Sequence, residues 1–393
     1  MAEQKRNPGA YIEDTWKKKD GTPKARNGVG KRWRVIVVNL DGERAGGGGY
    51  FERKTDAETH RNAVNAKLLQ GDYVTEKAGL VTVEAVYEEW LTQQAGVADS
   101  TQSTREITWE VWVSPKWRKH RVRDVRKSGV RSWVTEMVDD GAGAATIENA
   151  VGVLRMVMAL AVEDKRLSAN PAVGVKLPPR DHRPRAYLTH EQVWELAEKT
   201  DPRYRVLVLF LAYSGLRFGE AAALEVRDID FLRRRVEVRQ QVTEVKGRLV
   251  WTPTKGKRRR SVPFPKFLVD DLSLLCVDKG RTVQVFQAPK GGTLRLNSWR
   301  KRTWNTAINT LREVDDFPAA TPHDMRHTAA SLAISANANV KAVQTMLGHK
   351  SAALTLDTYS DLFPADLDGV ATAFDREVAA MMARRAEGAE AAE

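Results

Sequence analysis

The sequence predicts a multidomain α+β protein that is mainly helical, and three observations lead to this prediction. The chain has 393 residues, more than an ordinary single domain contains. Residues 1–75 include short runs rich in β-branched side chains, whereas residues 80–177 carry apolar side chains at helical spacing. A stretch rich in proline and charge at 177–184 precedes a third region, 186–375, in which helical patterns surround a small antiparallel sheet, and residues 376–393 form a tail.

The N-terminal region is predicted to be a small sheet followed by a helix. Residues 32–38 have the composition of a strand, and residues 50–53 can return beside it. The four glycines at 46–49 are expected to form a loop between them. They are not a phosphate-binding loop, because no Lys-Ser/Thr pair follows. Asp56 is expected to cap a helix that runs to about Leu69.

The second region is predicted to be helical throughout. Thr82 begins a segment with apolar residues on one face, and residues 147–161 repeat apolar side chains at helical spacing. Four tryptophans in this region are interpreted as core or interface residues and not as platforms for stacking bases: Trp109, Trp112, Trp117 and Trp133.

The third region is predicted to be mostly helical with one interruption by strands. Residues 206–212 form an apolar helix that ends at Ser214-Gly215. Residues 235–238 alternate like a strand, residues 245–251 can pair back through Lys246-Gly247, and residues 261–263 can add a third strand.

The charge distribution predicts a polyanionic partner. Lys plus Arg outnumber Asp plus Glu by 63 to 51, giving a formal charge of +12. Residues 116–131 hold eight basic residues and one acid, and residues 233–260 hold eleven basic residues and two acids, whereas the tail is acidic. Basic blocks with an acidic end suggest a surface that faces DNA. The candidate DNA contacts are Lys31, Arg32, Arg34, Lys116, Arg118, Lys119, Arg121, Lys257, Arg258 and Arg259.

Composition also excludes several classes of protein. A single cysteine, Cys276, excludes a disulfide framework and a cysteine-based metal site. No membrane span and no signal peptide are expected, so the sequence predicts a soluble protein of the cytoplasm.

Five separate sites between residues 214 and 359 carry polar groups suited to phosphate chemistry. In the first, two glycines surround Arg217 at a helix start, and Glu220 follows at a distance that allows it to orient the guanidinium. The second is a basic turn that contains Lys255, which can act as a general acid or can contact the DNA backbone.

The third site is the segment Thr321–His327. Thr321 is expected to be the N-cap and Pro322 the first helical residue, so that His323 and Arg326 share one face near the positive end of a helix. His323 and His327 are four residues apart, as in some metal sites. The glutamate of a His-Glu-x-x-His motif is absent, however, so no metal is expected.

The fourth and fifth sites complete the order. Gly348 ends a helix and is followed by His349, and Tyr359 comes ten residues later on a short helix. Each signal is ordinary alone. The joint order of Arg, Lys, His-x-x-Arg, Gly-His and Tyr is specific.

This order resembles the catalytic domain of the tyrosine recombinases, the family of phage integrases and Xer-type resolvases. The resemblance covers residues 188–364. Less specifically, residues 82–176 resemble the helical, SAM-like core-binding domain of the family, and residues 1–70 resemble the three-stranded arm-binding module of its longer integrases. Asp361 stands where relatives often have a histidine.

The resemblance implies a role for each site residue. Tyr359 attacks the scissile phosphorus and leaves a 3′-phosphotyrosyl link. Arg217, Arg326 and His349 bind the non-bridging oxygens, and Glu220 supports Arg217. His323 assists proton transfer near the nucleophile. Lys255 protonates the 5′-oxygen, although Lys257 lies in the same turn; Lys255 directly follows Pro253-Thr254, where the family places this lysine.

The resemblance also implies double-stranded DNA as partner, with core-type and arm-type sites, a homotetramer on DNA, and no cofactor, metal or ATP. Such a protein acts at the nucleoid of a bacterial host and integrates or excises a phage or mobile element. An Xer-like resolvase, a type IB topoisomerase and a non-catalytic DNA-binding regulator are the alternatives. The need for an excisionase or a host DNA-bending protein, and the attachment-site sequences, stay open.

Overall fold

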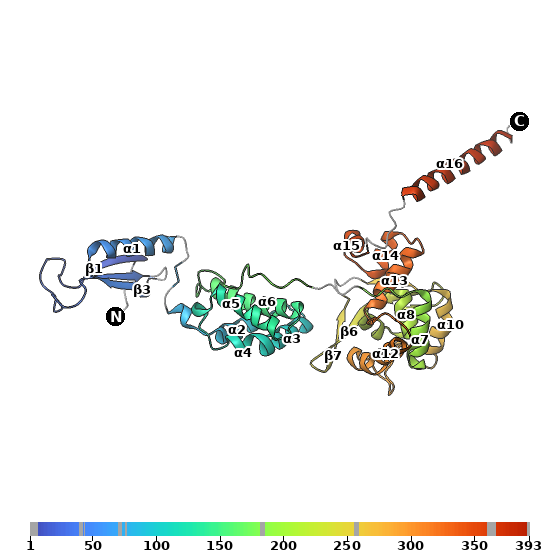
Figure 1. The fold of residues 1–393 in the computed structure, drawn as a ribbon, viewed down its shortest axis with the longest axis horizontal. Helices are drawn as coiled ribbons and strands as arrows, with labels where there is room; N and C mark the ends of the chain where they lie inside the picture. Colours follow the sequence, from blue (N-terminus) through green and yellow to red (C-terminus); the bar gives the residue numbers. More distant parts are fainter. Residues whose placement is uncertain are drawn as a thin grey trace. The chain divides into compact units, whose positions relative to one another are not determined.

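The computed structural model describes residues 7–38, 42, 44–69, 73–74, 77–180, 185–254, 259–359 and 367–390 (Figure 1). It divides into two compact units, Met1–His182 and Arg183–Glu393. The division falls in the stretch rich in proline and charge between the second and third predicted regions. Each unit is described by itself.

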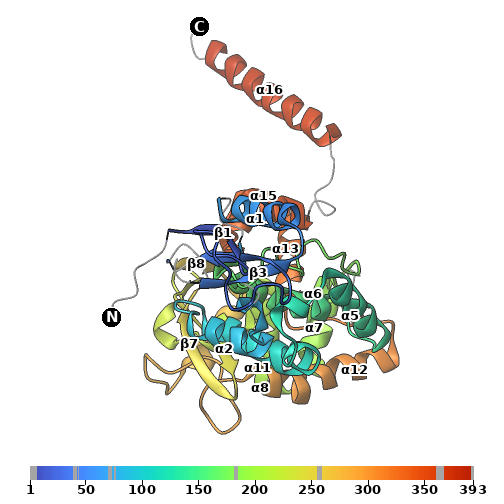
Figure 2. The ribbon, with the colours of Figure 1, turned by 90° about the vertical axis from the view of Figure 1, so that its left-hand side faces the viewer.

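The first unit begins with a three-stranded antiparallel sheet and one helix. The sheet has the order β1 (Gly9–Asp14), β2 (Trp33–Val38) and β3 (Arg44–Phe51), and helix α1 (Lys54–Leu69) lies along one face of it (Figures 1 and 2). Alternate strand residues point toward the helix, as the period of two requires. The resulting small core contains Ala10, Val35, Val37, Ala57 and Val64.

Two expectations about this region are wrong. The glycines at 46–49 belong to β3 and do not form a loop. Pairing with β2 holds them, and a side chain on Gly48 would run into the backbone carbonyl of Val35, so the strands approach this closely only with glycine there. Helix α1 begins at Lys54, so Asp56 is not the N-cap. It lies in the first turn, where its negative charge interacts favourably with the positive end of the helix dipole.

The rest of the first unit is helical. Thr82 caps the first helix by accepting the backbone N–H of Ala85 at 3.2 Å, as predicted. Trp109, Trp117 and Trp133 are buried and Trp112 packs against them, which confirms their interpretation as core residues. The helices are α2 (Val83–Thr92), α3 (Asp99–Thr108), α4 (Ser114–Trp117), α5 (Lys127–Asp139) and α6 (Ala144–Glu163), and a π-helical turn (Trp109–Val113) joins α3 to α4.

The expectation that no segment is long and apolar enough to cross a membrane is wrong. Helix α6 meets this criterion by length and composition alone. Its apolar side chains are used within the helical core. Ile147, Val151, Leu154 and Met158 are each fully buried there, which is the behaviour of a central core helix.

The core of the second unit contains the apolar helix α8, in which residues 207–212 are all buried. Its helices are α7 (His190–Lys199), α8 (Pro202–Ser214), α9 (Phe218–Ala222), α10 (Val269–Cys276), α11 (Leu296–Trp299), α12 (Asn305–Val314), α13 (Asp324–Ser335), α14 (Val340–Leu347), α15 (Ala352–Tyr359) and α16 (Leu367–Glu390). Its strands are β4 (Ile229–Asp230), β5 (Arg235–Val238), β6 (Gln240–Val245), β7 (Arg248–Pro253) and β8 (Arg260–Pro263).

The strands form two small antiparallel sheets. Strands β6 and β7 form a hairpin through Lys246 and Gly247, which both have positive φ, so the predicted turn is confirmed. Its first strand, β6, was not predicted. Strand β8 does not extend this hairpin; it pairs with β5 in the order β4-β5-β8. Residues 261–263 therefore form the expected strand in a different sheet.

Candidate active site

The first predicted site residue, Arg217, lies where two helices meet. Helix α8 ends at Gly215, which has φ +65°. A Cβ atom on Gly215 would lie 2.9 Å from the Leu347 side chain, so glycine lets the end of α8 approach the end of α14. Arg217 then stands at the N-cap of α9, with its side chain about one third exposed.

Glu220 holds two arginines. The Arg217 backbone N–H donates to Glu220 Oε2 at 2.9 Å, and Arg217 Nη1 donates to Oε1 at 3.2 Å. Arg260 Nη1 and Nη2 donate to the same two oxygens at 2.9 and 2.6 Å, and the Glu220 side chain is 0% exposed. Burial alone would raise the pKa of Glu220, but the hydrogen bonds and charge of Arg260 outweigh it and the pKa is lowered. The carboxylate is therefore ionised and fixed beneath Arg217.

Arg260 is a site residue that sequence reasoning missed. Its Nε donates to the Met346 carbonyl at 3.1 Å, so it joins β8 to the end of α14. Its side chain also passes close to Gly348, where a Cβ atom would lie 3.0 Å from the Arg260 Cδ. The signal in the sequence is weak, since Arg260 is only the last residue of a basic run before an apolar strand.

Helix α13 positions the His-x-x-Arg pair, and it begins two residues later than predicted. It starts at Asp324, with His323 at the N-cap. The Asp324 carboxylate accepts the Thr321 N–H and hydroxyl, each at 2.7 Å. The acid therefore bonds back to Thr321 and not the reverse, which is why Thr321 is not the N-cap and Pro322 not the first helical residue.

Arg326 is buried, with 3% of its surface exposed, and it joins two helix ends. Its Nη1 donates to the Gly215 carbonyl at 2.8 Å, and its Nη2 donates to the Leu347 carbonyl. Burial and the charge of Arg217 lower its pKa to about 10, so it remains a cation at neutral pH. A buried cation beside a second arginine favours a bound anion.

Two of the predicted site residues are histidines near these arginines. Burial, followed by the charges of Arg326 and Arg217, lowers the pKa of His349 to about 4 and also lowers that of His323. His349 Nδ1 lies 2.9 Å from the Thr355 hydroxyl, which fixes its ring on the side of α15. Both histidines are uncharged at neutral pH and can supply N–H groups.

Tyr359 ends α15 and is 1% exposed. Its ring packs among Ala330, Ile334, Val343 and Leu347, and its hydroxyl lies 3.0 Å from His327 Nδ1. Burial raises the pKa of Tyr359 to about 12, although the charge of Arg326 opposes this rise. The Tyr359 ring also lies nearly parallel to that of His349, with centroids 6.4 Å apart.

The structure thus brings together Arg217, Glu220, His323, Arg326, His349 and Tyr359, whose contacts and charges act on one another. His323 and His327 lie edge to face, and the described residues contain no group of three or more His, Cys, Asp or Glu suited to a metal ion. Lys255, Lys257 and Arg258 lie outside the described residues.

An open cavity of about 500 Å³ lies next to Arg217 and His323. Two further arginines line it: Arg295, which bonds to Glu244 at 2.7 Å, and Arg300, which is exposed. The cavity gives the two catalytic candidates, Arg217 and His323, a solvent-facing side with a positive lining.

The predicted DNA contacts that lie among the described residues are only partly available. Arg32 pairs with Asp14 at 2.9 Å, Lys116 with Glu136 at 2.6 Å and Arg118 with Glu84 at 2.5 Å. The remaining candidates are Lys31, Lys119, Arg121 and Arg259, which are exposed, and Arg34, whose guanidinium lies over the Tyr50 ring and 4.0 Å from the Glu13 carboxylate.

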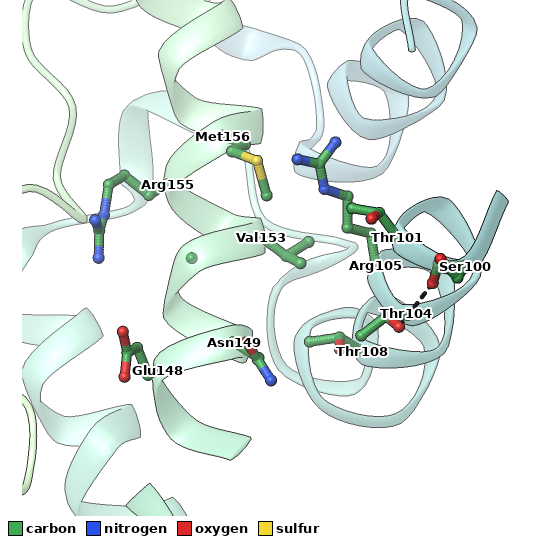
Figure 3. A pocket seen from close by; sticks show the side chains of 11 residues that line it. Ser100, Thr101, Thr104, Arg105, Thr108, Glu148, Asn149, Val153, Arg155 and Met156 are labelled. Carbon is green, nitrogen blue, oxygen red and sulfur yellow. Dashed lines mark hydrogen bonds between the residues drawn. The ribbon is translucent and has the colours of Figure 1, made fainter. Parts of the chain in front are cut away.

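A groove of about 480 Å³ between α3 and α6 was not predicted (Figure 3). Hydroxyl groups of α3 line one wall, among them Thr101 and Thr104, and Asn149, Val153 and Met156 of α6 face them (Figure 3). Glu148 and Arg155 also border the groove, with their side chains extending from the side of α6 turned away from α3 (Figure 3). Helical spacing of apolar residues marked only the buried face of α6, and nothing in the sequence marked α3, so the polar face between the two helices gave no separate signal.

The lowered histidine pKa values predict a pH dependence of stability. Below the ordinary pKa of 6.5, the unfolded chain binds protons that folded His327 and His349, each with a pKa of about 4, do not bind. The free energy of unfolding should therefore fall as the pH drops from about 6.5 to about 5. Its slope against pH should correspond to about two more protons bound by the unfolded chain than by the folded chain. Urea unfolding in phosphate-free buffer measures the free energy of unfolding at each pH. His349→Asn should make this free energy depend less steeply on pH. A stability that does not change between these pH values would contradict the prediction.

Sequence comparison gives one matching family and many relatives. Residues 186–365 match the Phage integrase family. Tyrosine recombinase XerC of Mycobacterium tuberculosis is 30% identical over 243 residues, which cover 58% of this chain and 76% of that protein. The transposase from transposon Tn916 of Enterococcus faecalis is 26% identical over 303 residues, covering 71% of this chain and 74% of the transposase.

Solved structures share the fold. The Tn1549 transposon integrase in complex with a circular intermediate DNA aligns with a TM-score of 0.65 at 20% identity, covering 75% of this chain and 99% of that one. A lambda integrase dimer bound to a COC′ core site aligns with a TM-score of 0.54 at 15% identity, covering 91% and 96%. A lambda integrase tetramer bound to a Holliday junction aligns with a TM-score of 0.52 at 16% identity, covering 81% and 94%.

Proposed function

Because the chain belongs to the phage integrase family of tyrosine recombinases and is thus a tyrosine-type site-specific DNA recombinase, we propose that Tyr359 is its nucleophile. The observation that carries this proposal is the cluster around Arg326. Two guanidiniums, two uncharged histidines and a buried tyrosine converge there from helices α9, α13, α14 and α15. Two cations can neutralise a phosphodiester transition state without a metal.

Each residue has a part in the proposed reaction. Tyr359 Oη attacks the scissile phosphorus, the bond to the 5′-oxygen breaks, and a 3′-phosphotyrosyl link conserves the bond energy for rejoining. Arg217, Arg326 and His349 bind the non-bridging oxygens, and Glu220 fixes Arg217. Lys255 protonates the leaving 5′-oxygen, and His323, beside Arg217, assists proton transfer.

A suicide substrate tests this function. In core-site DNA nicked near the cleavage position, attack releases a short fragment that carries the new 5′-hydroxyl. This fragment diffuses away, so the covalent protein–DNA adduct accumulates. We expect an adduct stable to denaturation with the native chain and none with Tyr359→Phe, which removes only the hydroxyl. An adduct that survives this substitution would refute the assignment.

We propose that the recombinase is an integrase that acts for a phage or mobile element, with an Xer-like resolvase as the alternative. In sequence, the XerC alignment covers 58% of the chain, whereas that of the Tn916 transposase covers 71%. The N-terminal sheet has one face free of α1, on which Tyr11, Arg34 and Tyr50 are at least partly exposed. Such a face can enter a DNA groove and bind arm-type sites.

Deletion of residues 1–70 tests the role of this module. The truncated protein should lose binding to arm-type DNA and should still cleave the core site, because the module has its own small core and shares no residue with the active site. Electrophoretic mobility shifts on separate arm and core fragments measure both properties. Equal arm binding by the full and truncated proteins would contradict the proposal.

We propose that the groove between α3 and α6 faces core-type DNA (Figure 3). Threonine hydroxyls, Asn149 and Arg155 are side chains that read base edges or bind phosphates. Arg155→Ala should weaken core-site binding and reduce its salt dependence, while leaving the arm-site affinity unchanged. Unaltered core binding would exclude the groove.

We propose that the chain forms a homotetramer on DNA, which the lambda integrase tetramer bound to a Holliday junction supports. We propose that it acts in the cytoplasm of a bacterial host, at the nucleoid. Helix α16 carries Phe374, Val378, Met381 and Met382, which are exposed and available to pack on a neighbouring subunit. Truncation after residue 364 should abolish cooperative synapsis.

We also propose an excisionase and a host DNA-bending protein as partners of such an integrase. Each is tested by adding it to the recombination assay.

A further inference from the structure

The hydrogen bond between Tyr359 and His327 has no part in the function proposed above. His327 Nδ1 lies 3.0 Å from the Tyr359 hydroxyl, and the two rings meet edge to face with centroids 5.8 Å apart. The tyrosine is 1% exposed, so water does not compete freely for this hydroxyl. Any group that takes the phenolic proton during attack must therefore come from the protein around it.

His327 is uncharged in the free protein, so the lone pair of its Nδ1 is available to accept a proton. Burial, followed by the nearby ring of His323 and the charge of Arg185, lowers its pKa to about 4. A phenol whose pKa is raised to about 12 is a donor at neutral pH, and a neutral Nδ1 is its acceptor. With the proton of the ring on Nε2, Tyr359 Oη donates to His327 Nδ1.

The other two histidines of the site are placed differently. His349 Nδ1 bonds to the Thr355 hydroxyl, whereas the Tyr359 hydroxyl bonds to His327. His323 lines the cavity beside Arg217, on the side from which DNA would approach. His327 is thus the histidine that touches the reacting oxygen.

Two contacts hold the pair in place. Arg185 Nη1 donates to the Thr358 carbonyl at 2.7 Å, which fixes the last turn of α15. The Leu188 N–H donates to the Thr328 hydroxyl at 3.2 Å, directly after His327 on α13. Both bonds come from the segment that enters this unit, so both members of the pair are fixed by one stretch of chain.

We propose that His327 is a catalytic residue that accepts the Tyr359 proton during strand cleavage and returns it during rejoining. The inference rests on the proposed function of Tyr359. In cleavage, the bond from Tyr359 Oη to phosphorus forms, the bond to the 5′-oxygen breaks, and the phenolic proton moves to Nδ1. The 5′-oxygen takes its proton from a separate acid, the proposed Lys255. In rejoining, each transfer runs in reverse.

The bound phosphate makes this transfer easier. Arg185 and Arg326 disfavour an imidazolium at His327 in the free protein, and a phosphodiester bound at Arg326 offsets the charge of that guanidinium. The imidazolium that forms on proton transfer is then less opposed than in the free protein. His327 therefore becomes a stronger base when the DNA phosphate binds, so Tyr359 is activated only in the DNA-bound state.

His327→Asn separates proton transfer from positioning, because the Asn Oδ1 can still accept a hydrogen bond but does not take a proton. In single-turnover cleavage of nicked core-site DNA we expect a rate lower by about 10²- to 10⁴-fold, with core-site binding retained. The matched control is His190→Asn, which alters a second His–Tyr pair, His190 Nδ1 to Tyr213 Oη at 2.8 Å, outside the site. The control should cleave at the native rate, and native-rate cleavage by His327→Asn would overturn the inference.

A second comparison excludes a merely structural role. A fluorinated tyrosine at position 359 has a lower phenol pKa and loses its proton more readily. It should therefore reduce the difference in cleavage rate between the native chain and the His327→Asn variant. The restored cleavage would also show that the Asn variant is folded. A gap that stays unchanged with the fluorinated nucleophile would overturn the inference. Absence of any adduct with the native chain would instead refute the proposed function and this inference with it.

Discussion

Arg326→Ala is expected to reduce single-turnover cleavage of the core site by at least about 10³-fold, because it removes a preorganised cation from the proposed phosphate site. It should also lower stability. The Gly215 and Leu347 carbonyls would lose their buried donor, at a cost of about 1–3 kcal/mol each. Cleavage is measured with the nicked substrate, and stability by urea unfolding.

Two companion variants separate charge from geometry. Arg326→Lys keeps the positive charge but cannot reach both carbonyls with a planar fork, so cleavage should stay far below the native rate. Arg205→Ala removes an arginine that pairs with Asp271 at 3.1 Å outside the site, and it should cleave as the native chain does. Cleavage by Arg326→Ala equal to that of the Arg205→Ala control would exclude Arg326 from the chemistry.

Glu220→Ala is expected to destabilise the second unit by about 3–5 kcal/mol, because it leaves a buried cation without its partner. The Glu220 side chain is 0% exposed and that of Arg260 is 10% exposed. The change also frees Arg217, so cleavage should fall beyond what the loss of stability explains. Chemical unfolding and single-turnover cleavage at low temperature measure the two effects.

The matched control for Glu220 is another glutamate–arginine pair of the same unit. Glu244 bonds to Arg295 at 2.7 Å, but this pair is more exposed, so Glu244→Ala should cost only about 0–1 kcal/mol. A similar loss of stability in both variants would contradict the account of a buried, charge-paired Glu220. Glu220→Gln keeps the shape and should lie between the native chain and Glu220→Ala.

Most of the candidate site could be predicted because its residues follow local signals. Arg217 follows a glycine that ends one helix, His323 and Arg326 begin another, and His349 follows a second helix-ending glycine. Helix ends of this kind are marked by short-range residue preferences. Their order along the chain then identified the family, and the comparisons confirm that identification.

The features that sequence reasoning missed depend on contacts between distant residues. Arg260 meets Glu220 from a strand forty positions away, and nothing local distinguishes it from the basic residues before it. The glycines of β3 form a strand because β2 holds them, which overrides their own preference. His327 suggested only a metal pair, because its partner, Tyr359, lies on another helix.

The most direct test of the central claim is to identify the residue that becomes linked to DNA. The trapped adduct is digested with trypsin and nuclease, and the peptide that carries a nucleotide is sequenced by mass spectrometry. The account predicts a single modified peptide, with a 3′-nucleotide on Tyr359. A nucleotide on any other residue, or a link to a 5′-phosphate, would contradict it.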